Sequence, residues 1–364
     1  MRIKDITNYL ETFAPLAYQE SYDNSGLMVG DPNSDFTSGL ITLDITEAVI
    51  DEAIEAGHNL IIAHHPLIFK GLKKLTGSHW VEKCVIKAIK HDISLYAIHT
   101  NLDNVLLGVN KKICDQLGLI DTKTLNPKSG ILTKLVTFTP KETTDSVLKA
   151  LYAAGAGEIG NYDHCSFRVD GTGTFRPGEN TNPHIGFSNV DESVNEDRIE
   201  VIFPTHISGK VLSALHQAHP YEEVAYYLSS LDNKHQEVGS GMVGHLENEM
   251  DPFEFLSYLK RTMKTNCVRH TPIHTKTVKK IAVCGGAGSF LLSKAIGAKA
   301  DVFITGDFKY HDFFEADNKI IVADIGHYES EQFTKDLLYD ILSKKFTNIA
   351  LRLSEVQTNP INYL

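Results

Sequence analysis

Residues 59–66 of the sequence read Asn59-Leu60-Ile61-Ile62-Ala63-His64-His65-Pro66. The apolar part has the length of a strand, and continuous apolar runs are typical of strands buried on both faces of a parallel or mixed sheet. Within a strand, neighbouring side chains point to opposite faces, so two adjacent histidines could not serve one site. Because Pro66 takes the chain out of the sheet, that constraint is lifted. The stretch therefore predicts a buried strand that presents His64 and His65 at its carboxyl end.

Short apolar runs and helical patterns alternate on both sides of this stretch and again near the C-terminus. Strands are expected at residues 39–43, 93–98, 280–284, 302–305 and 320–324, and helices at residues 46–56 and 81–90. A long amphipathic helix is expected after Gly326 and His327, with apolar side chains at helical spacing: Phe333, Leu337, Leu338, Ile341 and Leu342. The pattern predicts the α/β class, with a mixed-sheet core domain formed by residues 1–128 and 236–364.

The middle of the chain, residues 129–235, has a different pattern. It contains an internal repeat with an offset of 64 residues, visible in three matched pairs: Thr139-Pro140 with Phe203-Pro204, Val147-Leu148 with Val211-Leu212, and Ala150-Leu151 with Ala214-Leu215. Each copy reads as a strand, a turn marked by proline, a helix and a further strand. A doubled unit of this kind predicts an inserted ferredoxin-like βαββαβ domain, with residues 171–186 as its long connecting loop or ribbon.

The composition narrows the class of partner. The chain has 364 residues, a formal charge of -11 and 42% hydrophobic residues, which is typical of a globular protein. No basic cluster suggests binding to nucleic acid, and an acidic surface disfavours anionic membranes. The N-terminal segment does not read as a signal peptide, no apolar run is long enough to span a membrane, and the five cysteines form no CxxC pattern. We expect a cytoplasmic protein whose partner is a small molecule or another subunit.

Polar residues follow several of the expected strands. His64 and His65 end one strand, Asp103 follows another, and His327 and Glu331 are spaced i, i+4 at the start of a helix, which puts them on one face. Ligands bind at the carboxyl ends of strands in open α/β sheets. Three imidazoles and two carboxylates suit zinc, manganese or iron, not calcium. We predict two divalent metal ions, zinc first, with at least one bridging carboxylate.

Ordinary structural roles are also open to these residues. Asp103 could be a turn or cap residue, and Glu331 could simply favour the helix dipole. The turn at residues 285–289, Gly-Gly-Ala-Gly-Ser, could cradle a phosphate or could only allow a tight turn. Lys309, Tyr310 and His311 are expected to line the mouth of the crevice.

Six stretches together resemble the Nif-three-like family, the GTP cyclohydrolase type 2 homologues. They are residues 23–30 (Asp23 to Gly30), 63–67, 99–103, 283–288, 305–307 and 326–331. The resemblance places the family's dinuclear metal ligands on His64, His65, Asp103, His327 and Glu331. It also implies that the insert resembles the PII/CutA-type signalling fold, and that the protein forms a ring-shaped homohexamer whose metal sites face an internal cavity.

Two classes of function fit these features. The first is a metal-dependent hydrolase acting on a nucleotide-like or phosphoester small molecule, in which His99, His311 or Tyr310 supplies a proton. The alternative is a non-enzymatic, metal-handling or regulatory assembly in which the PII-like insert senses a ligand. A protein adaptor is a third, weaker possibility.

Overall fold

The computed structural model describes residues 1–364, and the chain divides into two compact units. The first unit comprises Met1–Asn126 and Glu237–Leu364, and the second comprises Pro127–Gln236. The second unit is thus an insertion in the sequence of the first. Both boundaries, Asn126/Pro127 and Gln236/Glu237, lie in extended chain. No helix combines the length and the apolar character needed to cross a membrane.

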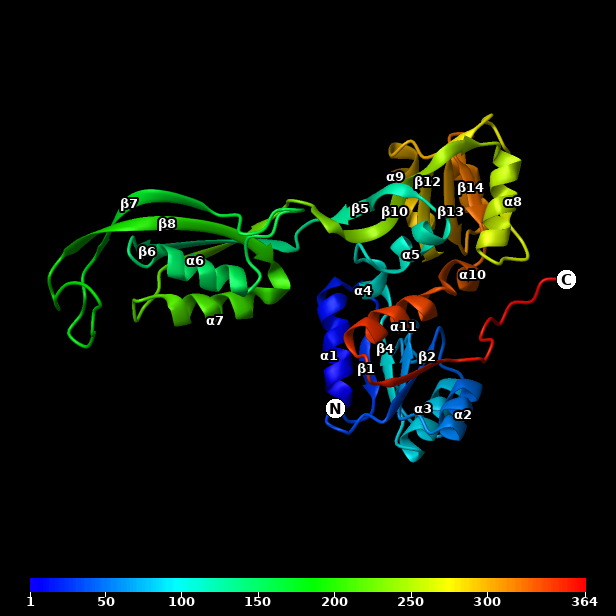
Figure 1. The fold of residues 1–364 in the computed structure, drawn as a ribbon, viewed down its shortest axis with the longest axis horizontal. Helices are drawn as coiled ribbons and strands as arrows, with labels where there is room; N and C mark the ends of the chain where they lie inside the picture. The colour runs from blue at the N-terminus through cyan, green and yellow to red at the C-terminus, as the bar shows by residue number, and fades with distance from the viewer. The chain divides into compact units, whose positions relative to one another are not determined.

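The first sheet of the first unit contains the strand that His64 and His65 follow. Its order is β1-β4-β3-β2-β15, with β1 antiparallel to β4 and all other pairs parallel. The strands are β1 (Gly26–Val29), β2 (Ser38–Thr42), β3 (Leu60–Ala63), β4 (Ser94–Ala97) and β15 (Ala350–Leu353). The helices α2 (Glu47–Ala56) and α3 (Trp80–Lys90) lie side by side on one face (Figure 1). The opposite face packs on α1 (Ile3–Phe13) and α11 (Thr334–Lys345).

The second sheet of the first unit has the order β11-β14-β13-β12-β10-β5. Its central strands β12, β13 and β14 are parallel, and β10 and β11 run antiparallel to them. The strands are β5 (Ile120–Lys128), β10 (His235–Met250), β11 (Arg269–His270), β12 (Val278–Ala287), β13 (Val302–Gly306) and β14 (Ile321–Asp324). One face packs on α9 (Leu292–Gly297) through Phe303 and Ala295.

One hydrophobic core joins the two sheets of the first unit. It contains Ile62 of β3, Ile304 of β13 and Leu338 of α11, together with residues of α5 (Val109–Gln116) and α8 (Pro252–Thr262). Apolar burial on this scale fixes the sheets against each other, because separating them would expose these side chains to water. The carboxyl ends of strands from different sheets are thereby held in one region.

The second unit is a four-stranded antiparallel sheet with two helices. Its elements follow the order β6 (Leu132–Pro140), α6 (Thr144–Ala153), β7 (Phe167–Phe175), β8 (Glu192–Pro204), α7 (Ser208–Ala218) and β9 (Tyr226–Leu231). The sheet order is β7-β8-β6-β9. The repeat has a packing reason: Val147 and Leu151 of α6 and their matched residues Val211 and Leu215 of α7 are fully buried.

The expected α/β class with mixed sheets is confirmed, and the first unit has two such sheets. One expectation needs correction. The expected long helix after Gly326 is two helices, the short α10 (His327–Glu331) and α11, with Gln332 and Phe333 between them. Within the stretch expected as a loop or ribbon, residues 171–175 belong to β7 and pair with β8, and the connecting loop begins after Phe175.

Candidate metal centre

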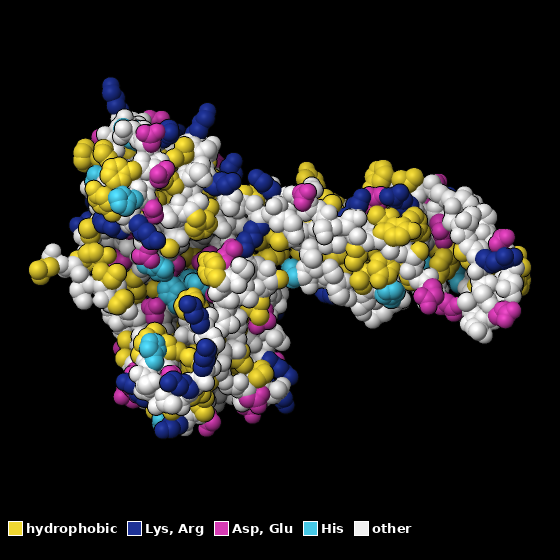
Figure 2. All heavy atoms as spheres, turned by 180° about the vertical axis from the view of Figure 1, so that it is seen from behind, with side chains coloured by type: hydrophobic (Ala, Val, Ile, Leu, Met, Phe, Trp, Pro, Cys, Tyr) yellow, Lys and Arg dark blue, Asp and Glu magenta, His cyan; other side chains and the backbone are white.

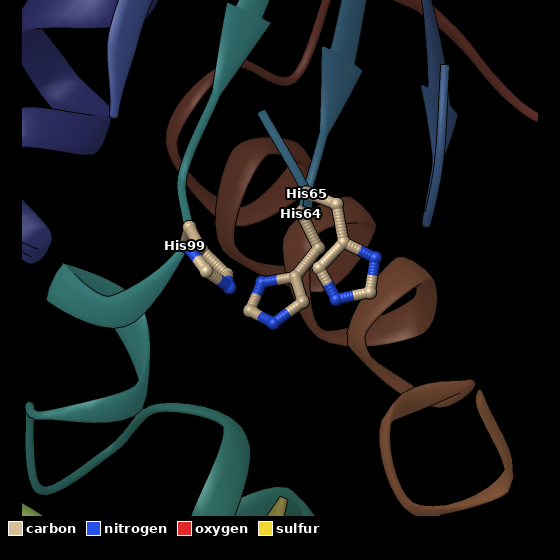
Figure 3. A group of neighbouring side chains, drawn as sticks. All are labelled: His64, His65 and His99. Carbon is tan, nitrogen blue, oxygen red and sulfur yellow. The ribbon is translucent and has the colours of Figure 1, made fainter. Parts of the chain in front are cut away.

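Three strand ends of the first unit, those of β3, β4 and β14, bring the candidate ligands to one place. His64 and His65 directly follow β3, and His99 follows β4 as the first residue before α4 (Thr100–Asp103). His327 begins α10 after β14, and Glu331 ends that helix. Figure 3 shows the imidazoles of His64, His65 and His99 side by side, with His64 in the middle. Their ring centroids are 4.9 to 5.4 Å apart.

The buried carboxylate of Glu331 is the centre of the cluster. Its Oε2 lies 2.9 Å from His65 Nε2 and 3.2 Å from His327 Nε2, and its Oε1 lies 3.7 Å from His64 Nε2. The Nε2 atoms of His65 and His327 are 3.3 Å apart. Residues from two sheets, more than 260 positions apart in the sequence, therefore share one carboxylate.

Two buried polar atoms in the cluster have no hydrogen-bond partner. They are His64 Nε2 and Asp103 Oδ1, which lie 3.6 Å apart. Leaving such atoms unsatisfied costs about 1–3 kcal/mol each, so native structures pair them with protein, water or an ion. An imidazole nitrogen and a carboxylate oxygen are both metal ligands. The residues present thus fit a divalent cation.

The Nδ1 atom of each imidazole forms a hydrogen bond with an oxygen that is not itself one of the candidate ligands. His64 Nδ1 bonds to the carbonyl of Ile98 at 2.8 Å, and His65 Nδ1 to Asp44 Oδ1 at 2.7 Å. His99 and His327 make the same bond at 2.8 Å, to Asp23 and Asp307. A proton on Nδ1 leaves Nε2 as the free lone pair, which is how metal-ligating histidines are oriented in proteins.

The electrostatics of the cluster also favour a cation. Burial raises the pKa of Asp103, and the negative charge of Glu331 raises it further. Burial opposes the charged form of His65, but Glu331 and Asp44 outweigh it and raise the pKa of His65 to about 9. The pKa of His327 is raised to about 11, against the effect of burial, by Glu331 and Asp307. Without a metal, the cluster therefore holds protons that a divalent cation would replace.

Gly286 leaves the room that the cluster needs. Its φ is +63°, and a Cβ at this position would meet Glu331 Oε1 at 2.5 Å and His327 Cε1 at 3.2 Å. The residue before the helix, Gly326, also has positive φ, at +96°. Both positions favour glycine for conformational reasons as well as for space.

The cluster forms the floor of a cavity of about 880 Å³ in the first unit. In Figure 2, histidine side chains gather in a hollow with acidic and hydrophobic side chains around them. The cavity is lined by His65, His99, Asp103, His327 and Glu331, while His64 lies beneath its surface. Three groups of donors are close enough to hold an ion: His64-His65-His99, His65-His327-Glu331 and His64-Asp103-Glu331.

The structure does not bring every sequence candidate into the cluster. Lys309, Tyr310 and His311 do not line the cavity, so the expectation that they form its mouth is wrong. They lie at an exposed 3-10 turn (Tyr310–Ala316), where His311 contacts the rings of Tyr310 and Phe314. His99, expected as a proton donor only, lies among the possible ligands.

The sequence interpretation did not predict that three carboxylates of the site hold the histidines: Asp23, Asp44 and Asp307. Asp23 begins a stretch that resembles the family, Asp44 follows an expected strand, and Asp307 follows Gly306. Position at a strand end was thus the available signal. The pairing of each with one histidine depends on contacts between distant segments, which the sequence does not contain.

We expect Asp44→Asn to weaken metal binding about 10–100-fold, because the Asp44 carboxylate fixes the proton on His65 Nδ1. Asparagine keeps the shape but removes the charge that favours this bond. Zinc affinity measured by competition with a chromophoric chelator checks the result. The matched control is Asp51→Asn, an exposed aspartate of α2 paired with Lys87, which should leave the affinity unchanged.

The fold and the cluster define a class: a two-unit α/β protein with a candidate metal centre between the carboxyl ends of two sheets. The model of the Duf34/NIF3 family (NGG1p interacting factor 3) matches residues 1–360. The GTP cyclohydrolase 1 type 2 homolog of Bacillus subtilis is 40% identical over 367 residues, covering 99% of this chain and 98% of that protein. The homolog of Halalkalibacterium halodurans is 38% identical with the same coverage. The chain belongs to the Duf34/NIF3 family.

Solved structures agree with this membership. A Bacillus cereus protein related to NIF3 matches with a TM-score of 0.87 and 38% identity, covering 100% of this chain and 99% of that one. Staphylococcus aureus protein SA1388 matches with a TM-score of 0.80 and 30% identity, with the same coverage. The resemblance inferred from six short stretches is confirmed over the whole chain.

Proposed function

We propose that this protein is a hydrolase that depends on two divalent cations, held by His64, His65, Asp103, His327 and Glu331. The observation that carries the proposal is that two groups of donors share Glu331: His65-His327-Glu331 and His64-Asp103-Glu331. A carboxylate with one oxygen toward each group can bridge two neighbouring ions. Imidazole and carboxylate donors suit zinc, and also manganese or iron.

Ions bound here would supply Lewis-acid activation of water and of a substrate oxygen at neutral pH. The chain's own residues orient the metal ligands and form the cavity for the substrate. Asp44 and Asp307 hold His65 and His327 in the orientation that aims Nε2 at Glu331. The cavity above them accommodates a small molecule of a few hundred Å³.

His99 is the residue we propose for proton transfer. It lines the cavity, and Asp23 fixes its Nδ1 atom at 2.8 Å, which leaves Nε2 to accept or donate a proton. Asp23 also accepts hydrogen bonds from the backbone N–H and the hydroxyl of Thr100. Burial raises the pKa of this carboxyl, but the His99 imidazole and the bonds from Thr100 outweigh it and lower the pKa. A carboxylate held ionised in this way stabilises the protonated imidazole during turnover.

A regulatory role for the second unit is the second candidate function. This unit has its own cavity of about 570 Å³, lined by aromatic residues such as Tyr221 and Tyr227 and by the buried Glu196. Its βαββαβ order supports the assignment to the PII/CutA type. We propose that it senses a ligand within a cytoplasmic homohexamer. Light scattering of the purified chain would test whether the chain forms a hexamer.

The test of the hydrolase proposal combines metal analysis with turnover. Protein purified without added metal should contain about two divalent ions per chain by mass spectrometry, and chelation should abolish hydrolysis of a small-molecule panel. Re-addition of zinc or manganese should restore it, and His65→Ala should not be restored. Turnover that survives both chelation and His65→Ala would contradict the proposal.

A further inference from the structure

The cavity above the cluster is chemically unlike a phosphate site. We propose that it binds an aromatic or heteroaromatic compound without phosphate groups, so that a nucleoside triphosphate is not its substrate. The inference rests on the proposed function as far as a reaction of the bound compound is concerned. The binding preference itself rests only on the residues that line the cavity.

The charged side chains of the cavity wall do not favour a phosphate group. Five carboxylates line it, from Glu20, Asp44, Asp103, Asp307 and Glu331, and Lys70 is the single lysine or arginine. Two divalent ions on the floor would be offset by these carboxylates. Apart from metal ions, phosphate recognition in proteins relies on arginine forks, lysine or free backbone amides. The wall therefore offers little to balance the several negative charges of a triphosphate.

The glycine-rich turn at residues 285–289 does not supply the missing donors. The amide of Gly285 donates to Asn110 Oδ1 at 3.0 Å, and the amide of Gly286 donates to Ser330 Oγ at 2.9 Å. The amide of Gly288 donates to Thr305 Oγ1 at 2.9 Å. These three N–H groups are already satisfied, so the turn is not a phosphate cradle of the kind that depends on free amides.

An apolar wall faces the polar floor. Phe69 and Trp80 line the cavity and are each 51% exposed, although burial of such large rings is favourable. The ring of Phe69 lies edge-on to His99, with 5.7 Å between centroids and an angle of 87°. Further apolar lining comes from Leu72, Phe290 and Ile361. A planar ring can pack against Phe69 and Trp80 while its polar edge reaches the cluster.

The chain contains its own reporter for this test, because Trp80 is its only tryptophan. Zinc-loaded protein is titrated with two matched pairs, guanosine with GTP and phenol with phenyl phosphate, and Trp80 fluorescence is followed with excitation at the red edge. We expect at least one phosphate-free compound to bind tighter than its phosphorylated partner by about tenfold or more. Tighter binding of both phosphorylated compounds, or no binding of either phosphate-free compound, would overturn the inference.

A variant pair separates ring packing from the metal centre. Phe69→Ala should weaken binding of the phosphate-free compound about tenfold without changing zinc content, since Phe69 has no ligand atom. The control Phe253→Ala removes an exposed ring of α8 that does not line the cavity. Equal affinities of the two variants would contradict the inference. If the protein binds no zinc but the metal-free chain still binds the phosphate-free compound, the hydrolase proposal fails and the binding preference remains.

Discussion

Glu331→Gln should reduce the metal affinity by about 100-fold and the metal content to one ion per chain or fewer. This carboxylate lies beside three imidazoles, and two of the three groups of donors contain it. Glutamine keeps the size but has no charge to offset two cations, and its NH₂ group would point a donor at an imidazole nitrogen or an ion. The expected loss of metal affinity equals the largest losses found when a residue that only orients a metal ligand is replaced. Mass spectrometry of metal content and calorimetric zinc titration measure it.

The matched control is Glu329→Gln on the same short helix. Glu329 is also buried, but it accepts a hydrogen bond from Asn359 Nδ2 outside the cluster. It should keep both ions. Glu331→Gln protein that binds two ions with unchanged affinity would remove the bridging carboxylate from the proposal, and with it the shared centre.

Phe303→Ala should lower the free energy of unfolding of the first unit by about 3–5 kcal/mol. Phe303 is fully buried in β13, and its ring packs near Phe308 with 6.3 Å between centroids. Truncation loses apolar burial and leaves a cavity that β13 and α9 cannot fill without moving. Urea denaturation followed by circular dichroism measures the change.

Phe253→Ala is the control for the stability prediction, because the same ring is removed from an exposed position. Its effect should stay within about 0.5 kcal/mol. A loss below about 1 kcal/mol for Phe303→Ala would show that the β13 region is not packed as the structure describes.

The elements that the sequence predicted best are the buried strands. Residues 59–63, 302–305 and 320–324 each match a strand to within one residue, at β3, β13 and β14. Continuous apolar runs predict such strands accurately because a strand that is buried on both faces has mostly apolar side chains. The break between α10 and α11 was missed, because Gln332 and Phe333 continue the helical pattern without glycine or proline.

The sequence by itself determined which residue types stand at strand ends, and hence His64, His65, Asp103, His327 and Glu331 as candidates. It determined the repeat as well, because two copies of one motif bury the same positions. Only the tertiary structure decided that Asp23, Asp44 and Asp307 hold the histidines, and that His311 lies elsewhere. The physical reason is that local patterns report burial and period, whereas the meeting of distant strand ends depends on how two sheets pack through one core.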